Sequence, residues 1–319
     1  SPDQAHYNHC HCYFCYPIEI LKNENVHRNV VAEVTTQDKQ YPWIVFTGLE
    51  EVLYLFKGKN VDIRAIPEGT IFRSRDQKGI PVPVLSIEGD YVNFAIYETP
   101  LLGLICQASG ISTKASRFKK LIGNKTLFSF GVRRMHPALA PMIDRYSYIG
   151  GCDYVSSIIG AENLGLEPRG TMPHALILIL GEDLAWKKFD EDVDPNVPRI
   201  ALVDTFGDEK FSSVRAAEII KDLNGVRLDT PSSRRGDFAH IIREVRWELD
   251  LRGYKNVSIV VSGGIKEENV KELIEAGADS FGVGTTISSA STIDYAMDIV
   301  EIDGKPMAKK GKFSGKKDV

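Results

Sequence analysis

Two carboxylates in this chain end apolar segments of the kind that form buried strands. Asp204 ends the segment IALVD, and Asp229 ends the segment VRLD. Carboxylates at strand ends can bind ribose hydroxyls, hold Mg²⁺ through oxygen ligands, or stabilise a cationic, sugar-like transition state. The structural alternative is that each aspartate caps the helix that follows it. Because both strands are expected to end at one rim, we interpret the two aspartates as a functional pair.

Two glycine-rich segments, VSGGI and FGVGTT, also follow apolar runs and precede expected helices. Glycines at such a turn let the backbone approach an anion, with its amides and the helix N-terminus turned toward the charge. Two such loops in tandem near the end of a barrel are its usual phosphate-binding site, which we favour over simple tight turns. The residues expected to form it are Ser262, Gly263, Gly264, Gly282, Gly284 and Thr285.

Arginines cluster at two places in the sequence. In the first cluster, Arg133 and Arg134 follow an apolar segment that ends near Phe130. Guanidinium groups suit carboxylates or phosphates, and a phenylalanine ring can stack on an aromatic ligand. Positive charge at this density on a predicted rim favours an anionic substrate over a merely solvated basic face. The second cluster comprises Arg227, Ser232, Ser233, Arg234 and Arg235.

Two further polar residues, His174 in GTMPHAL and Asp153 in GGCDYVSS, stand alone in the sequence. A lone histidine is more often structural than catalytic, so its presence does not establish a role. The same caution holds for the lone aspartate. Both residues need the context of a family before a function can be assigned to them.

The elements that must position these residues predict two domains of different character. From about residue 18 to 100, short strands rich in β-branched and aromatic residues mix with one amphipathic helix. After residue 197, apolar strands alternate with single helices, which is typical of a parallel sheet. We predict an α/β protein with an N-terminal α/β sandwich domain over 18–100, completed by 298–319, and an incomplete α/β-barrel domain over 101–297. In such barrels, ligands bind at the carboxyl ends of the strands.

Composition excludes several classes of function. The chain has 319 residues, a net charge of −4 and a pI of about 6.0, so no global positive field favours nucleic acid. No run of about 18 apolar residues predicts a membrane span. The polar beginning of the sequence does not resemble a secretory signal. Five cysteines, an odd number, do not predict a disulfide framework, and we expect a cytoplasmic protein.

Residues 1–17 are rich in cysteine and histidine, with cysteines at Cys10, Cys12 and Cys15 and three histidines nearby. These ligands suffice in number for tetrahedral zinc. The spacing of Cys10 and Cys12 is tighter than usual, however, and no second ligand pair follows at the spacing of a zinc finger. We therefore favour an altered or disordered N-terminal segment over a structural zinc site.

Together, the motifs resemble those of the nicotinate phosphoribosyltransferases of the short archaeal kind, a type II phosphoribosyltransferase family. The resemblance extends from about residue 18 to 319 and includes FTGLEEVL, AIPEGT, ICQASGISTKAS, FSFGVRRMHP, GTMPHAL and RLDTPSSRRG. It implies an α/β sandwich beside an incomplete α/β barrel. It also implies NAD biosynthesis, in which nicotinate and phosphoribosyl pyrophosphate give nicotinate mononucleotide and pyrophosphate. ATP hydrolysis would be coupled through a transiently phosphorylated histidine, with Mg²⁺ as cofactor.

By motif match, the resemblance implies a role for each candidate residue. His174 would be the phosphorylated histidine, Phe130 would stack on the pyridine ring, and Asp153 would face the pyridine end. Arginines 133 and 134 would meet the nicotinate carboxylate or the pyrophosphate. The remaining implied roles place Asp204 and Asp229 beside the ribose and Mg²⁺, Arg227 on a phosphate, and Gly263, Gly264, Gly282 and Gly284 around the 5′-phosphate.

Two alternative functions stay open at this point. One is a different pyridine phosphoribosyltransferase that acts on quinolinate or nicotinamide. Quinolinate has a second carboxylate and would need more basic residues around the ring, and the GTMPHAL histidine argues for the ATP-coupled enzyme instead. The other is a truncated, inactive subunit with an assembly role, since the first 17 residues match nothing in the family. The family's shared active sites predict a homodimer or a larger homo-oligomer.

Overall fold

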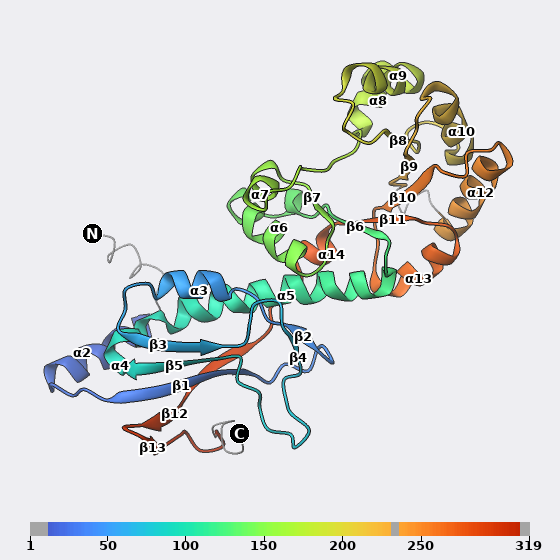
Figure 1. Ribbon diagram of the computed structural model, residues 1–319. Coiled ribbons are helices and arrows are strands. Elements are labelled where there is room, and N and C mark those ends of the chain that lie inside the picture. The colour runs from blue at the N-terminus through green and yellow to red at the C-terminus, as the bar shows by residue number, and fades with distance from the viewer. Residues whose placement is uncertain (1–11, 231–235, 313–319) are drawn as a thin grey trace. The chain divides into compact units, whose positions relative to one another are not determined.

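The computed structural model describes residues 12–230 and 236–312, and it divides into two compact units (Figure 1). The first unit comprises residues 1–113 and 290–319, and the second comprises 114–289. Each unit contains one main sheet: the first is antiparallel and the second is parallel. The predicted fold class is confirmed, with an N-terminal sheet domain and a C-terminal parallel half-barrel.

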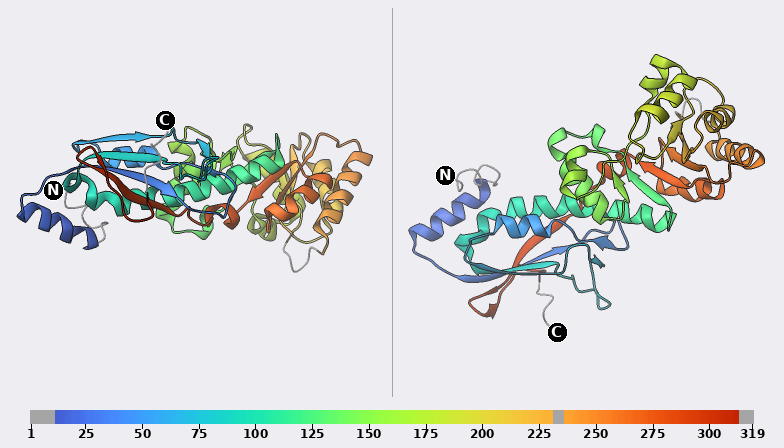
Figure 2. Two further views of the ribbon diagram at one scale, coloured as in Figure 1. Left: turned by 90° about the horizontal axis from the view of Figure 1, so that it is seen from below. Right: turned by 45° about the horizontal axis from the view of Figure 1, so that its top comes forward.

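The sheet of the first unit has five strands in the order β13-β12-β1-β5-β3. Segments far apart in the sequence meet in it, because β12 pairs antiparallel with β1 and the C-terminal strands lie beside the N-terminal ones (Figure 2). A separate pair joins β2 and β4. The strands are β1 (Asn29–Thr36), β2 (Ile44–Val45), β3 (Val61–Ala65), β4 (Ile71–Phe72), β5 (Leu85–Asp90), β12 (Tyr295–Ile302) and β13 (Lys305–Pro306).

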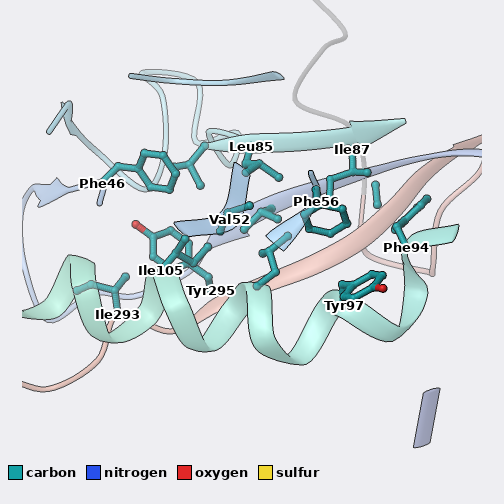
Figure 3. Packing of buried hydrophobic residues seen from close by; sticks show 14 of the residues in the cluster. Phe46, Val52, Phe56, Leu85, Ile87, Phe94, Tyr97, Ile105, Ile293 and Tyr295 are labelled. Atoms are coloured by element: carbon teal, nitrogen blue, oxygen red, sulfur yellow. The ribbon is translucent and has the colours of Figure 1, made fainter. Parts of the chain in front are cut away.

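Helix α5 (Glu98–Ile122) covers this sheet and closes its hydrophobic core (Figure 3). Leu101 and Ile105, four residues apart and therefore on one helix face, are both fully buried. They pack with Leu85 and Ile87, which alternate with polar residues on β5 as a half-buried strand requires. The other helices here are η1 (Cys12–Phe14), α2 (Cys15–Asn23), α3 (Leu49–Leu55), α4 (Tyr91–Phe94) and η2 (Ala95–Tyr97).

The stretch Tyr91–Ile122, which contains α5, is long and apolar enough by length and composition to cross a membrane. Its most apolar window is 56% buried inside the protein, as is usual for a core helix. The boundary between the two units also lies within this helix, between residues 113 and 114. The sequence-based division at residues 100 and 101 falls near its beginning, because an uninterrupted helical pattern carries no sign of where one core ends.

The second unit contains six parallel strands in the order β7-β6-β11-β10-β9-β8. Strands β7 and β8 follow one another in the chain but lie at opposite edges of the sheet, so the barrel stays open between them. Near-continuous apolar runs such as Ile259 to Val261 are buried, as expected for strands covered on both faces. The strands are β6 (Thr126–Ser129), β7 (Tyr154–Val155), β8 (Ile200–Leu202), β9 (Gly225–Leu228), β10 (Ser258–Ser262) and β11 (Ser280–Val283).

Helices connect these strands and form the outer layer of the half-barrel (Figure 1). Each strand therefore runs in the same direction, and all six carboxyl ends reach one edge of the sheet. The helices are η3 (Val132–Arg134), η4 (Pro137–Leu139), α6 (Ala140–Ile149), α7 (Ile158–Asn163), α8 (His174–Leu180), α9 (Glu182–Asp192), α10 (Glu209–Ile219), α12 (Phe238–Leu251), α13 (Glu267–Glu275) and α14 (Thr285–Ser288).

The first residue of α5, Glu98, has an unusually high pKa. Burial raises its pKa from the ordinary 4.5 to about 7, and the carboxylate of Asp298 adds to the rise. A glutamate at a helix N-terminus is normally favourable, because the helix dipole attracts negative charge. Loss of hydration outweighs that attraction here. Between about pH 4.5 and pH 7, the folded protein therefore keeps a proton on Glu98 that the unfolded chain has released.

We expect Glu98→Gln to make the protein more resistant to denaturant at pH 8 and to change nothing near pH 4. The folded-state pKa lies above the unfolded one, so wild-type stability falls as pH rises from about 4.5 to about 7. Guanidinium denaturation midpoints at several pH values measure this effect. Glu19→Gln, at an exposed site on α2, is the control. Parallel pH curves for wild type and Glu98→Gln would contradict the prediction.

Candidate active site

A cavity of about 550 Å³ lies at the carboxyl ends of the parallel strands in the second unit. Its walls come from the segments that follow β6, β7, β9, β10 and β11 and from the segment before α8. This is the edge at which α/β barrels bind their ligands. The lining residues are Phe130, Val132, Arg133, Arg134, Ser156, Gly170, Thr171, Arg227, Asp229, Ser262, Gly263, Gly264, Ile265, Gly282, Gly284, Thr285 and Thr286.

A hydrogen-bonded triangle of Arg227, Asp229 and Ser262 forms the floor of this site. Ser262 Oγ donates to Asp229 Oδ1 at 2.9 Å and accepts from Arg227 Nε at 2.9 Å. Arg227 Nη2 donates to Asp229 Oδ2 at 3.1 Å, and its Nη1 donates to Thr171 Oγ1. The parallel register of β9 and β10, with Leu228 opposite Val261, brings these side chains together. Each group is therefore held in one orientation before any ligand arrives.

Asp204 and His174 stand next to this triangle. Asp204 is 4% exposed, and its Oδ2 accepts a hydrogen bond from the Asp229 amide at 3.0 Å. Its Oδ1 has no hydrogen-bond partner within the described residues and lies 3.9 Å from His174 Nε2. His174 Nε2 is also 3.9 Å from Asp229 Oδ2, while its Nδ1 lies 3.1 Å from Thr205 Oγ1. The structure thus brings the three predicted catalytic side chains together.

Burial controls the electrostatics of Asp204. Loss of hydration raises its pKa, the neighbouring His174 lowers it, and the charge of Asp229 raises it again. Asp204 is only 4% exposed, so water would screen little of the attraction between its carboxylate and a positive centre that develops beside it.

The two predicted glycine loops both reach the cavity. Gly263 and Gly264 have φ angles of 76° and 65°, a region that favours glycine, so the backbone there takes a path that other residues would strain. At Gly282 an added Cβ would lie 2.5 Å from the Phe130 ring, so a larger residue would displace that ring. Small residues therefore keep this wall of the cavity open for an anion.

The rim of the cavity is positively charged. Arg133 and Arg134 lie in η3, are exposed and line the cavity. Within residues 12–230 and 236–312, neither of them pairs with a carboxylate, and Asp229 is the one acidic residue of the lining. With Arg227 included, three guanidinium groups face one carboxylate, which favours a ligand with several negative charges.

The aromatic residue Phe130 is held by its neighbours. Its ring stacks on Phe128 with centroids 5.4 Å apart, and Phe128 stacks in turn on Tyr154 at the same distance. The guanidinium carbon of Arg227 lies 5.4 Å from the Phe130 centroid. The ring is thereby fixed beside the arginine in the wall of the cavity.

The structure does not bring Asp153 to the cavity. Its carboxylate accepts hydrogen bonds from the Leu127 amide and from Lys119 Nζ, both at 2.8 Å. Asp153 precedes β7 and therefore lies at the amino edge of the sheet, opposite the site. Sequence reasoning missed Ser156 and Thr171, which do line the cavity. Proximity to His174 in GTMPHAL was the available signal for Thr171.

Some of the predicted site residues lie outside the residues that the structure describes. Ser232, Ser233, Arg234 and Arg235 of the second basic cluster lie in the undescribed segment 231–235. Of the predicted zinc ligands, Cys10 lies outside the described residues and the side chain of Cys12 is not described, while Cys15 is exposed on α2. Among the side chains that are described, no group of three or more His, Cys, Asp and Glu could hold a metal ion.

Fold and cavity together define the class of this molecule: an incomplete α/β-barrel protein with a cationic ligand site at the carboxyl ends of its strands. The chain belongs to the quinolinate phosphoribosyl transferase family. The model of that family's C-terminal domain matches residues 111–298, and the model of its N-terminal domain matches residues 19–109.

Solved structures and curated relatives show the same scaffold. The chain is 54% identical to the nicotinate-nucleotide pyrophosphorylase of Pyrococcus furiosus, with a TM-score of 0.92 over 97% of this chain and 79% of that one. Human nicotinic acid phosphoribosyltransferase, 19% identical over 93% of this chain and 75% of that one, shares the fold with a TM-score of 0.67. A nicotinate phosphoribosyltransferase of Mycobacterium tuberculosis is 28% identical over 243 residues, 72% of this chain. The chain spans about half the length of that curated relative, 53%.

These findings correct the function expected from the sequence. The family models and the Pyrococcus furiosus structure identify the quinolinate type, so the assignment to ATP-coupled nicotinate phosphoribosyltransferases was wrong. The expectations that ATP and nicotinate are partners and that a histidine is phosphorylated rested on that assignment, and they were wrong as well. His174 is not among the residues that line the cavity, and its Nε2 stands between two carboxylates. The GTMPHAL motif, which had favoured the ATP-coupled enzyme, stands in a chain that the family models place in the quinolinate family.

We expect Arg227→Lys to weaken the binding of inorganic pyrophosphate by about tenfold, because lysine keeps the charge but cannot hold Ser262, Thr171 and Asp229 at once. Isothermal titration calorimetry of wild type and variant measures the change. Arg243→Lys, an exposed arginine on α12, is the matched control. Unchanged affinity in Arg227→Lys would show that the fork geometry of this arginine does not contribute to anion binding.

Proposed function

We propose that this protein is a quinolinate phosphoribosyltransferase. It would transfer the phosphoribosyl group of phosphoribosyl pyrophosphate to the ring nitrogen of quinolinate and release pyrophosphate. Formation of nicotinate mononucleotide requires that the carboxylate beside the nitrogen leave as CO₂ and that a proton take its place. The observation that carries the proposal is a cavity with three guanidinium groups and one carboxylate, in a chain of the quinolinate phosphoribosyl transferase family.

The charges of the substrates match those of the cavity. Phosphoribosyl pyrophosphate is polyanionic, and quinolinate carries two carboxylates. Arg133 and Arg134 stand on the exposed rim, and Arg227 is held inside by Asp229 and Ser262. This separation supports the view that the rim pair binds carboxylates or the leaving pyrophosphate, while the glycine loops that contain Gly264 and Gly284 hold the 5′-phosphate.

The chemistry needs electrostatic stabilisation more than proton transfer. Loss of pyrophosphate from the anomeric carbon develops positive, oxocarbenium-like charge on the ribose. Asp229, fixed by two hydrogen bonds to its neighbours, and Asp204, buried behind it, supply negative charge that is already oriented. The pyridine nitrogen is itself a nucleophile, so no general base is required at that step. The fixed Phe130 ring would limit how the pyridine can lie.

Mg²⁺ fits these residues as a companion of the substrate. Magnesium in such sites is bound by one or two carboxylates together with substrate phosphates and water. Within the described residues, Asp229 is the carboxylate that lines the cavity, and it would hold the ion together with substrate phosphates and water. When bound, the ion would neutralise charge on the leaving pyrophosphate. A cytoplasmic location and a homodimeric or larger assembly stay predictions.

The decisive experiment is a parallel assay of pyridine mononucleotide formation with phosphoribosyl pyrophosphate and Mg²⁺. We expect product from quinolinate, release of one CO₂ per product, and no effect of added ATP. Nicotinate and nicotinamide are the control substrates, because each lacks the second carboxylate. Product from nicotinate alone would contradict the proposal. No product from any of the three would favour an inactive subunit.

We expect Asp229→Asn to lower kcat by about 10²- to 10³-fold, as loss of an oriented charge at a reacting centre commonly does. The variant keeps the size of the side chain and an oxygen that can accept the Ser262 hydrogen bond, but it loses the charge that pairs with Arg227. We therefore expect a lower thermal midpoint, and turnover is compared per folded enzyme at a temperature below both midpoints. Steady-state turnover with quinolinate is the measurement. Asp208→Asn, which alters a helix cap at the start of α10, is the control. Near-normal turnover of Asp229→Asn would contradict the prediction and would show that this aspartate has a structural role only.

A further inference from the structure

The turn between β7 and α7 forms part of the cavity wall and carries a polar group that has no hydrogen-bond partner within the described residues. Ser156 lines the cavity, and its Oγ is buried and makes no hydrogen bond within the described residues. The next residue, Ser157, caps α7, because its Oγ accepts a hydrogen bond from the Gly160 amide at 3.1 Å. The position of Ser156 therefore depends on how firmly Ser157 is held.

Asp144, on helix α6, holds Ser157 from behind. Its Oδ2 accepts hydrogen bonds from the Ser157 amide at 3.0 Å and from Ser157 Oγ at 2.5 Å. The contact is tight, since an added Cβ at Gly160 would lie 2.5 Å from the same Oδ2 atom. Two hydrogen bonds to one carboxylate oxygen thus fix both the backbone and the side chain of the turn.

This arrangement is costly for the fold. Asp144 is fully buried, and its Oδ1 has no hydrogen-bond partner in the described part of the chain. Burial raises the pKa of Asp144, and hydrogen bonding from Ser157, with a smaller contribution from Ser129, opposes that rise. A buried carboxylate with an unsatisfied oxygen destabilises a protein, whereas a helix cap needs only the serine. The cost of burying the acid favours a role beyond capping.

We propose that Asp144 is a positioning residue for substrate binding: through Ser157 it fixes the turn that carries the cavity-lining Ser156, whose unpartnered hydroxyl turns to donate to a carboxylate of the bound pyridine substrate. Asp144 itself does not touch the ligand. The inference rests on the proposed function for the identity of the ligand, but the hydrogen bonds that position the turn do not depend on it.

The test is a double-mutant cycle with quinolinate as the varied substrate. We expect Asp144→Ala to raise KM for quinolinate about tenfold, with kcat and the KM for phosphoribosyl pyrophosphate within about threefold of wild type. Asp144→Asn should restore the wild-type KM, since its amide oxygen can accept both Ser157 hydrogen bonds. Ser156→Ala should raise KM equally, and Asp144→Ala with Ser156→Ala should add nothing further.

Asp279→Ala is the matched control, because Asp279 Oδ2 accepts a hydrogen bond from the Ile259 amide at the amino edge of the same sheet. Additive effects in the double variant, or an equal KM rise in Asp279→Ala, would overturn the proposal. If the wild type makes no product from quinolinate, the proposed function fails instead. Amide hydrogen exchange at Ser157 then decides the positioning step: exchange at least about tenfold faster in Asp144→Ala supports it, and unchanged exchange refutes it.

Discussion

The site depends on one set of hydrogen bonds, the triangle that joins Arg227, Asp229 and Ser262 across two parallel strands. The register of β9 and β10 places these side chains side by side, so the geometry is set by backbone pairing rather than by flexible loops. The same arginine donates a hydrogen bond to Thr171 and makes a cation–π contact with the Phe130 ring. The amide of Asp229 in turn holds Asp204. If this triangle moved, the arginine, the aromatic ring and both aspartates would move with it.

Charge in this part of the molecule is arranged in layers. Asp204 and Asp144 are buried and have raised pKa values, because water has been removed from around them. Arg133 and Arg134 stand at the rim, where water can solvate them when no ligand is bound. An anion that enters replaces that water and meets guanidinium groups that no nearby carboxylate already neutralises. Negative charge inside and positive charge outside suit a ligand whose anionic groups flank a centre that becomes positive.

The correction from nicotinate to quinolinate has a physical basis. Both substrates are pyridine carboxylates, and both reactions displace pyrophosphate from the same sugar. In the proposed function, the glycine loops and the aspartates would serve the shared donor, so motifs built from them cannot separate the two acceptors. The difference lies in the recognition of one additional carboxylate. We propose that hydrogen-bond donors on turns such as the one that carries Ser156 contribute to it.

Much of the fold and part of the site follow from the sequence. Alternating apolar strands and helices predicted the parallel half-barrel, and glycines after strands predicted which loops would reach the rim, because strand periodicity and turn chemistry are local properties. Only the tertiary structure showed that Asp153 lies at the amino edge, hydrogen-bonded to Lys119, and that Asp144 accepts hydrogen bonds from Ser157, next to the cavity-lining Ser156. Those roles depend on which strand lies beside which and on where a helix packs. A one-dimensional pattern does not contain such long-range contacts.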